Sequence, residues 1–202
     1  MKITMLGTGA WGTALAKVLH ENGNAVTLWD IDHETLEELR HGRSERYLPG
    51  VKLPLDWKVE ANFAKATGGA EGVVLAVPSQ SFRTVAARLK GHSAILVSVT
   101  KGIEFETGDP MSRILREHTP ANRVAALSGP SFAREVALGI PTTVVCASES
   151  AGTARIVQGL FHRPEFRIYR STDILGVEYG GALKNIIAIA AGIYWLFQDP
   201  SI

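Results

Sequence analysis

Residues 2–12 read Lys-Ile-Thr-Met-Leu-Gly-Thr-Gly-Ala-Trp-Gly, an apolar strand that runs directly into three spaced glycines. Gly7 permits a tight turn out of the strand, Gly9 lets the backbone approach phosphate groups, and Gly12 lets the following helix pack closely on the sheet. The free N–H groups and the dipole of the first helical turn then face negative charge. The stretch therefore predicts a pyrophosphate-binding turn for a dinucleotide at the start of an α/β fold.

The elements on either side of these glycines support that prediction, which the spacing alone would not, because 20 of the 202 residues are glycine. A helix is expected over 10–22, and a strand over 25–29 ends at Asp30. An acidic residue there accepts hydrogen bonds from the adenosine ribose, and its charge repels a 2′-phosphate, so we expect NAD rather than NADP. Alternatively, Asp30 caps the next helix, a role that Asp32 would fill at least as well.

The bulk composition is that of an ordinary globular protein. With 46% hydrophobic and 20% charged residues among 202, the chain can bury a sizeable core. The net charge of +1, with no local run of Lys or Arg, gives no electrostatic footprint for nucleic acid, so we expect no nucleic-acid partner. A single cysteine, Cys146, and scattered histidines argue against a disulfide and against a metal site.

The two ends of the sequence bear on localisation. The first strand occupies the N-terminus and leaves no room for a signal peptide, so we expect a cytoplasmic protein. Residues 186–197 are twelve apolar or glycine residues in a row, fewer than the about 20 that a bilayer span needs. A helix that is apolar on every side is normally a buried one, and we expect this helix to be buried.

Strand and helix signals alternate over most of the chain, which predicts a doubly wound, Rossmann-type α/β fold with a parallel sheet covered on both faces. Further strands are expected at 71–77, 94–99, 124–127, 142–147 and 166–169. Helices are expected at 31–41, 81–89, 111–118, 132–138 and 150–161, followed by one long helix over about 176–197. We therefore expect a dinucleotide-binding domain over 1–171 and the start of a helical domain over 172–202.

Three of the expected strands end in loops of small or polar residues, at 78–80, 100–102 and 128–131. Ligands of open α/β sheets bind beyond the carboxyl ends of the strands, so we expect these loops to share one cleft. Lys101 would hold a phosphate or polarise a carbonyl there, or would be an ordinary solvated lysine. Residues 128–133 superficially resemble a hydrolase nucleophile elbow, but Ala133 stands where the last glycine should be, so we reject that interpretation.

Lys184 interrupts a helix that is otherwise almost wholly apolar. Burial of an ammonium group is costly unless it is paired or discharged, and a lysine held away from water becomes a usable proton donor and acceptor near neutral pH. The alternative is a lysine that reaches solvent from the helix edge. Gly180 and Gly181 favour the functional interpretation, because they let a ligand approach the helix closely.

Six ordered motifs cover nearly the whole chain. They are Gly7-Thr-Gly-Ala-Trp-Gly-Thr-Ala-Leu-Ala16, Tyr47-Leu-Pro-Gly50, Val77-Pro-Ser-Gln-Ser-Phe-Arg83, Thr100-Lys-Gly-Ile-Glu104, Leu127-Ser-Gly-Pro-Ser-Phe-Ala-Arg-Glu-Val136 and Gly176-Val-Glu-Tyr-Gly-Gly-Ala-Leu-Lys-Asn-Ile-Ile-Ala-Ile-Ala-Ala-Gly192. Together they resemble bacterial NAD(P)-dependent sn-glycerol-3-phosphate dehydrogenase. The resemblance implies hydride transfer between a nicotinamide cofactor and sn-glycerol 3-phosphate or dihydroxyacetone phosphate, for the synthesis of phospholipid precursors.

The same resemblance assigns roles to individual residues. Including the glycine turn and the acidic residue, the expected cofactor-binding residues are Gly7, Gly9, Ala10, Trp11, Gly12, Asp30, Lys101 and Ala133. The expected substrate-binding residues are Lys101, Gly129, Ser131 and Lys184. Lys184 is also the expected proton acceptor when the alcohol is oxidised and the donor in the reverse direction, with Lys101 assisting it in catalysis.

The chain also departs from the family pattern. Family members often have a small residue and then His or Arg where this chain has Asp30-Ile31, a pair that suits NAD. Beyond Gly192 the family continues with a glycine-rich turn and a large helical domain, whereas this sequence reads Ile193-Tyr-Trp-Leu-Phe-Gln-Asp-Pro-Ser-Ile202. We therefore expect that much of the substrate domain is missing, that turnover is weak or absent, and that the uncovered helix drives assembly into a homo-oligomer.

Two other interpretations stay open. The chain would be an NAD(H)-binding module without turnover, or a dehydrogenase of the 6-phosphogluconate and hydroxyacid type, which shares the architecture and a helix lysine. Residues 127–133 and 180–185 favour the glycerol-3-phosphate type over the last of these.

Overall fold

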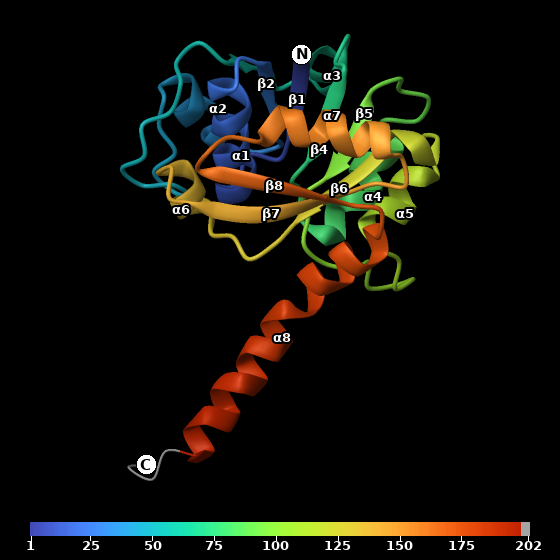
Figure 1. The fold of residues 1–202 in the computed structure, drawn as a ribbon. Helices are drawn as coiled ribbons and strands as arrows, with labels where there is room; N and C mark the ends of the chain where they lie inside the picture. The colour runs from blue at the N-terminus through green and yellow to red at the C-terminus, as the bar shows by residue number, and fades with distance from the viewer. Residues whose placement is uncertain (199–202) are drawn as a thin grey trace.

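Eight strands form one sheet in the computed structural model, which describes residues 1–198 (Figure 1). The strands are β1 (Lys2–Leu6), β2 (Ala25–Trp29), β3 (Lys58–Val59), β4 (Gly72–Leu75), β5 (Ile95–Ser98), β6 (Val124–Ser128), β7 (Thr142–Ala147) and β8 (Phe166–Ser171). Their order in the sheet is β3-β2-β1-β4-β5-β6-β7-β8. Each neighbouring pair of these strands is parallel except β6 and β7. The doubly wound α/β fold predicted from the sequence is confirmed.

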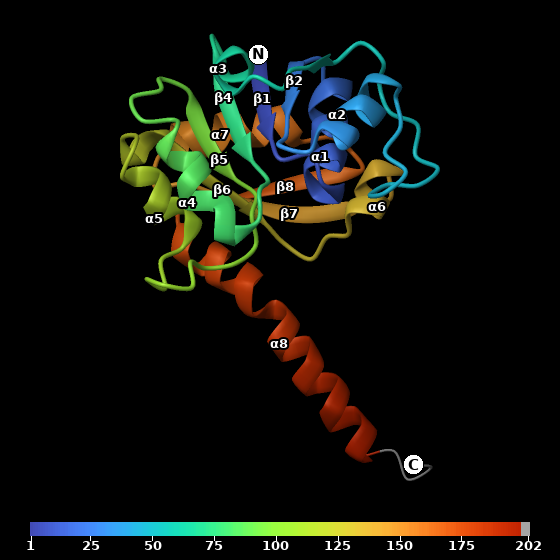
Figure 2. The same ribbon diagram turned by 180° about the vertical axis from the view of Figure 1, so that it is seen from behind.

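Helices cover both faces of the sheet. They are α1 (Ala10–Glu21), α2 (His33–Arg40), α3 (Phe63–Thr67), α4 (Ser79–Ala87), α5 (Met111–Arg116), α6 (Ala133–Ala137), α7 (Ala151–Phe161) and α8 (Ile174–Gln198), with a 3₁₀ turn η1 (Ala121–Arg123). Buried side chains of α1, α2, α6 and α7 form one core, and those of α3, α4, α5 and the start of α8 form the other. Figure 1 shows α7 in front of the sheet, and Figure 2, from behind, shows α4 and α5.

Side chains of the central strands alternate between these two cores. Met5 and Val97 pack on the α1 side, whereas Leu6 and Leu96 pack on the α4 side. A strand that is buried on both faces needs a continuous run of apolar residues, which is the pattern that predicted these strands. Each predicted strand and helix consequently begins and ends within two residues of an observed one.

Two features of the sheet differ from the sequence-based expectation. β7 runs antiparallel to β6, because the connection over 129–141 contains only the short α6 and re-enters the sheet at the edge where β6 ends. β8 then pairs in parallel with β7. β3 and α3 were not predicted, because they are only two and five residues long. Elements of this length are too short to show a periodic pattern.

The long helix α8 projects from the body of the molecule, on the side opposite the N-terminus (Figures 1 and 2). Its first residue, Ile174, and Glu178 are buried against the sheet and α5, but most of the following side chains are exposed. Ile187 is 67% exposed and Phe197 is 87% exposed. The expectation that the apolar run over 186–197 would be buried is therefore wrong for the part of the chain that the structure describes.

By length and composition alone, α8 also meets the criterion for a helix that could cross a membrane. Its candidate span runs over Ile174–Trp195, with a mean hydropathy of 1.3 and only 11% of its residues buried. The argument that the apolar stretch is too short thus fails for the helix as a whole. The span contains the ionisable residues Glu178 and Lys184, and such groups are costly inside a bilayer.

Candidate functional site

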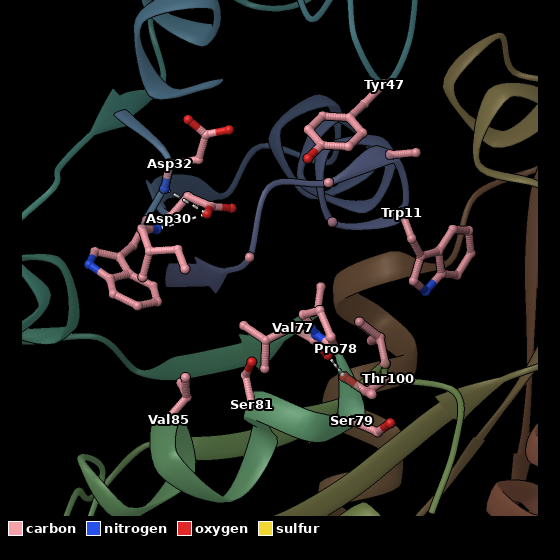
Figure 3. A pocket seen from close by; sticks show the side chains of 18 of the residues that line it. Trp11, Asp30, Asp32, Tyr47, Val77, Pro78, Ser79, Ser81, Val85 and Thr100 are labelled. Carbon is pink, nitrogen blue, oxygen red and sulfur yellow. Dashed lines mark hydrogen bonds between the residues drawn. The ribbon is translucent and has the colours of Figure 1, made fainter. Parts of the chain in front are cut away.

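A cleft of about 970 Å³ lies at the carboxyl ends of β1, β2, β4 and β5. Pro78, Lys101 and Ser131 are among its lining residues, so the three loops that were expected to converge all contribute to it. Figure 3 shows Trp11 toward one end of the cleft and Asp30 toward the other. Its position is the usual ligand site of an open α/β sheet, and its volume suits a ligand of dinucleotide size.

The glycine turn in this cleft is shaped by two different requirements. Gly7 has φ 94°, and an added Cβ would lie 2.8 Å from the carbonyl carbon of Ala76. An added Cβ on Gly12 would overlap the carbonyl oxygen of Gly7. Gly9, in contrast, lines the cleft, and among the described residues nothing beyond its chain neighbours lies within 4 Å of an added Cβ. The fold needs Gly7 and Gly12 as glycines, whereas Gly9 leaves space for a ligand.

The N-terminus of α1 opens onto the same cleft. Gly9 is its N-cap residue, no side chain caps the helix, and its first turn has no acidic residue. The positive end of the helix dipole is therefore free to attract an anion. The indole Nε1 of Trp11, in this first turn, is buried and has no hydrogen-bond partner within the described residues. A buried donor without a partner is suited to a ligand acceptor.

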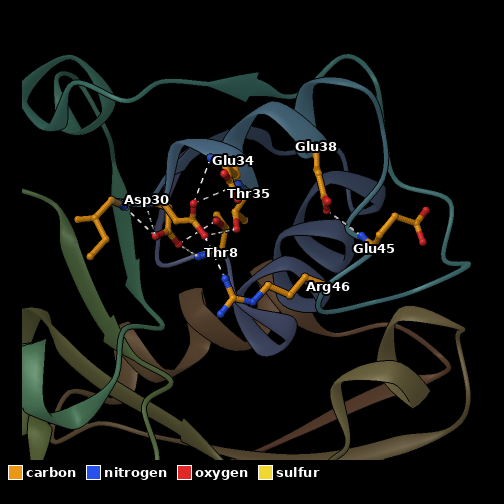
Figure 4. A network of polar contacts seen from close by, with 9 residues as sticks. Thr8, Asp30, Glu34, Thr35, Glu38, Glu45 and Arg46 are labelled. Atoms are coloured by element: carbon orange, nitrogen blue, oxygen red, sulfur yellow. Dashed lines mark hydrogen bonds and ion pairs between the residues drawn. The ribbon is translucent and has the colours of Figure 1, made fainter.

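Asp30 lies at the other end of the cleft, at the carboxyl end of β2. Its carboxylate accepts hydrogen bonds from the backbone N–H and hydroxyl of Thr8 and from the backbone N–H groups of Ile31 and Asp32 (Figure 4). The N-cap of α2 is Asp32, which accepts hydrogen bonds from the N–H groups of Glu34 and Thr35. The alternative that Asp30 caps this helix is therefore wrong.

Three further residues line the cleft near Asp30, and the sequence-based reasoning did not single them out. Arg46 lies 3.5 Å from an Asp32 oxygen and 5.2 Å from the ring centroid of Tyr47. Arg88 stacks on the ring of Phe63 at 3.8 Å. Tyr47 opens one of the motifs quoted above, which was a signal, whereas nothing in the sequence indicated Arg88.

Lys101 lies at the end of the cleft near Trp11. Its Nζ donates a hydrogen bond to Ser131 Oγ at 3.2 Å and lies 4.9 Å from the Trp11 ring centroid. Burial, and then the charge of Lys184, lower the pKa of Lys101 to about 8. An ammonium group of this kind is charged near neutral pH and can hold a phosphate, and it loses its proton under mildly basic conditions.

The loop that contains Lys101 is held by ionic contacts to α4. Arg83 donates to both carboxylate oxygens of Glu104, at 2.7 and 2.8 Å, and also to Glu117 at 2.6 Å. The hydrogen bonds from Arg83 and Thr107 lower the pKa of Glu104 to about 2, so this pair stays ionised across any ordinary assay pH. A bidentate contact fixes the geometry of the loop as well as its charge.

The segment after β6 brings Ser131 and Ala133 to the cleft, but Gly129 is not among the lining residues. An added Cβ on Gly129 would lie 2.9 Å from Cα of Val144 in β7. Its lack of a side chain is thus required by the close approach of the antiparallel strand.

Lys184 lies on α8 and does not line the cleft. Its side chain is half-buried, which lies between the embedded lysine and the lysine reaching solvent that the sequence left as alternatives. Its charge nevertheless contributes, after burial, to the lowered pKa of Lys101. α8 passes closely over β6 at Gly181, where an added Cβ would overlap the hydroxyl oxygen of Ser128.

Glu178 fixes the base of α8 on α5. Its carboxylate is buried and accepts hydrogen bonds from the backbone N–H of Ser112, at 2.8 Å, and from the Ser112 hydroxyl. Burial raises the pKa of Glu178, although the Ser112 hydrogen bonds and the charge of Arg116 act in the opposite direction. This contact was not predicted, because the sequence pattern around Glu178 does not indicate which residue it meets.

Comparison with known proteins gives matches along most of the chain. The family model described as NAD-dependent glycerol-3-phosphate dehydrogenase N-terminus matches residues 2–154. The model described as NAD-dependent glycerol-3-phosphate dehydrogenase C-terminus matches residues 173–198. The second match consists almost entirely of α8.

Individual relatives agree with these matches. The glycerol-3-phosphate dehydrogenase (NAD(P)+) of Syntrophotalea carbinolica is 47% identical over 200 residues, which cover 96% of this chain and 60% of that protein. The crystal structure of the enzyme from Coxiella burnetii has a TM-score of 0.86 and 33% identity, over 95% of this chain and 60% of that one. The enzyme from Plasmodium falciparum has a TM-score of 0.87 and 28% identity, over 95% and 58%. The chain thus spans about 60% of the length of the curated relatives that it matches.

Proposed function

Because this chain belongs to the NAD-dependent glycerol-3-phosphate dehydrogenase family, we propose that it binds a nicotinamide dinucleotide in the cleft above the glycine turn. We further propose that the protein transfers a hydride between this coenzyme and sn-glycerol 3-phosphate or dihydroxyacetone phosphate. The observation that carries the proposal is the turn itself, where the open side of Gly9 and the uncapped N-terminus of α1 line a cleft of dinucleotide size.

The residues present fit such a coenzyme. Gly7, Gly9 and Gly12 would let the diphosphate lie against the backbone, and the first turn of α1, with Ala10 and Trp11, would donate to it. The unpartnered Nε1 of Trp11 would gain an acceptor. The adenosine would then lie toward Asp30, and the nicotinamide toward Lys101 and Ala133. When bound, the nicotinamide supplies or accepts the hydride.

The substrate phosphate would be held at the Lys101 end of the cleft. Lys101 Nζ and Ser131 Oγ are within hydrogen-bond distance of each other, and Gly129 would act through Ser131, whose hydroxyl donates to the Gly129 carbonyl oxygen at 3.3 Å. Lys184 Nζ would accept the proton of the substrate hydroxyl on oxidation and return it to the carbonyl oxygen on reduction. Lys101 would assist from the same end of the cleft, where burial and then the charge of Lys184 lower its pKa to about 8.

We propose two domains for this chemistry, a dinucleotide-binding domain over 1–171 and the start of a helical substrate domain over 172–202. The break at 171–173 falls between β8 and α8, the latter of which projects from the sheet. Residues 199–202 of the second segment lie outside the described residues.

A preference for NAD over NADP is also proposed. Asp30 puts a negative charge at the adenosine end of the cleft, where it would repel a 2′-phosphate. Arg46 and Arg88 line the same end and act in the opposite direction. Titration of the protein with NAD and with NADP compares the two affinities, and tighter binding of NADP would contradict the preference.

A second candidate function is coenzyme binding without turnover. Its support is the position of Lys184, which is half-buried on a largely exposed helix and does not line the cleft. In that case the chain would bind NAD(H) but would not reduce dihydroxyacetone phosphate. Catalysis is favoured by the close approach of α8 to the end of β6 at Gly181, and by the charge of Lys184, which contributes to the lowered pKa of Lys101 in the cleft.

The two functions are separated by one assay. Oxidation of NADH with dihydroxyacetone phosphate, abolished by Lys184→Ala, supports catalysis, whereas no turnover with intact coenzyme binding supports the module. Coenzyme binding is measured by quenching of tryptophan fluorescence, with Trp11→Phe to identify the quenched indole. Absence of any binding by the folded chain would refute both functions.

We also propose that these 202 residues self-associate through α8. The support is the run of exposed apolar side chains on this helix, among them Ile186, Ile189 and Trp195, which are 63–66% exposed. Sedimentation at micromolar concentrations tests the proposal, and a monomer with α8 folded would contradict it.

We place the protein in the cytoplasm, where the reaction would supply sn-glycerol 3-phosphate for phospholipid precursors. Cys146, the only cysteine, is a buried free thiol, which is compatible with a reducing compartment. Fractionation of cells that express the chain is the direct test.

A further inference from the structure

The carboxylate of Asp30 is fully engaged by the protein itself. One oxygen accepts from the Thr8 N–H at 2.6 Å and from the Thr8 hydroxyl at 2.9 Å. The other accepts from the N–H groups of Ile31 at 2.7 Å and Asp32 at 3.1 Å. A carboxylate offers about four lone-pair sites, so each site has a donor. Figure 4 shows this network, of which Asp30 lines the cleft.

Thr8 connects Asp30 to the turn that faces the proposed diphosphate. It lies between Gly7 and Gly9, its side chain is 0% exposed, and it is not among the residues that line the cleft. Its carbonyl oxygen accepts a hydrogen bond from the Thr13 hydroxyl of α1, at 2.8 Å. The turn is thereby tied to β2 on one side, through Asp30, and to α1 on the other.

We propose that Asp30 is a positioning residue, which acts on the coenzyme by holding the glycine turn through Thr8 and not by accepting a hydrogen bond from the adenosine ribose. The inference rests on the proposed coenzyme site. A ribose hydroxyl could reach a lone pair of Asp30 only if one of the four present donors gave it up. The Thr8 contact is the costly one to lose, because its hydroxyl is buried and would be left unpaired, whereas the exposed N–H of Ile31 would return to water.

Variants of Thr8 and Asp30 test the inference. Thr8→Val keeps the shape of the buried side chain but removes the hydroxyl, and Thr8→Ser restores it. Asp30→Asn keeps one acceptor oxygen, so two of the four donors lose their partner. We expect Thr8→Val and Asp30→Asn each to weaken NAD binding about tenfold in calorimetry, the size of one hydrogen bond to a charged group. The double variant should be little weaker than Asp30→Asn alone, because both act through one contact.

A ligand modification separates this role from a direct contact. If Asp30 bound the ribose, an NAD analogue without the adenosine 2′-hydroxyl would lose affinity for the natural chain and not for Asp30→Asn. We expect the analogue to bind more weakly than NAD by the same factor in the natural chain and in Asp30→Asn. Asp32→Asn removes a charge from the same end of the cleft without touching the turn, and so measures the purely electrostatic effect.

A second readout does not need the coenzyme. In the free protein, Asp30→Asn and Thr8→Val should speed hydrogen exchange at the amides of Thr8 and Gly9, and Thr8→Ser should not. Unchanged exchange, or equal affinities of Thr8→Val and the natural chain, would overturn the inference, as would a loss with the analogue that disappears in Asp30→Asn. If the natural chain binds no coenzyme at all, the proposed function fails, and the exchange rates still decide whether Asp30 holds the turn.

Discussion

Gly181 of α8 lies directly over Ser128 at the end of β6, so close that a Cβ added to the glycine would overlap the serine hydroxyl oxygen. The next contact of that Cβ would be with Ser128 Cβ, at 3.4 Å. Ser128 Oγ is buried and has no hydrogen-bond partner within the described residues. A side chain at position 181 would therefore fit only if the Ser128 hydroxyl turned away or α8 moved from the sheet.

Gly181→Ala should force the Ser128 hydroxyl to turn or α8 to move, and should therefore stabilise the fold less than a Gly→Ala substitution at an open position of the same helix. The neighbouring substitution Gly180→Ala is a matched control, because an added Cβ there meets nothing within 4 Å. In a helix, Ala is favoured over Gly by about 1 kcal/mol, so Gly180→Ala should be neutral or stabilising. Urea unfolding followed by circular dichroism measures both. Equal stabilisation by the two substitutions would show that α8 does not approach β6 this closely.

Gly9→Ala and Gly12→Ala should separate ligand binding from folding. At Gly12 the new methyl group would overlap the carbonyl oxygen of Gly7, so the variant should lose stability by several kcal/mol, as overpacked sites do. At Gly9 the methyl group has open space in the free protein, so the fold should persist. Coenzyme affinity should nevertheless fall by tenfold or more in Gly9→Ala, because the methyl group takes the space of a phosphate. Thermal unfolding and fluorescence titration of the same samples give both values. Undiminished coenzyme affinity in Gly9→Ala would contradict the proposed position of the diphosphate.

The elements that carried a pattern in the sequence were predicted, and those fixed by tertiary contacts were not. Apolar runs predicted the strand before Gly7 and the other strands that are buried on both faces, because both faces of the sheet are covered by helices. β3 has only two residues, 58–59, which is too few for a periodic pattern. The antiparallel direction of β7 depends on the packing of the short helix α6, which the sequence pattern does not indicate.

The site divides in the same way. The glycine turn, Asp30, Lys101 and Ser131 were each marked by a motif and meet in one cleft. The donors that occupy Asp30 come from backbone groups, which no side-chain pattern records. An apolar composition predicted burial for α8, but burial depends on what packs against a helix, and the described residues cover only its base.

Glu178→Gln should remove part of the pH dependence of stability. Burial raises the pKa of Glu178 above its ordinary 4.5, so the folded state keeps this proton over a pH range in which the unfolded state has lost it. Stability should consequently fall as pH rises from 4.5 through the folded-state pKa, where Glu178 becomes charged between Ser112 and Arg116. The stability of the Glu178→Gln chain should lack this pH-dependent part, while Gln still accepts one Ser112 hydrogen bond. The measurement is the difference between the two urea-unfolding curves across pH 4.5–8. Parallel curves would refute a raised pKa at this position.

Lys184→Met should raise the pKa of Lys101. Burial and the neighbouring charge of Lys184 hold the pKa of Lys101 at about 8, against 10.5 for an ordinary lysine, and the substitution removes the second cause. Because the unfolded state keeps the Lys101 proton up to 10.5 while the folded state releases it near 8, this group should make the natural chain more stable as pH rises between those values. After allowance for solvent around a half-buried ammonium, the gain should be of order 1 kcal/mol. Affinity for a phosphate-bearing substrate should fall over the same rise in pH, since the charge on Lys101 disappears.

Titration of the lysine methyl signals after reductive ¹³C-methylation gives the midpoint of the Lys101 titration directly. The control is Lys17→Met, which removes a lysine ion-paired to Glu21 on α1. A Lys101 midpoint that stays near 8 in Lys184→Met, or that moves equally in Lys17→Met, would contradict the coupling of the two ammonium groups across the gap between the sheet and α8.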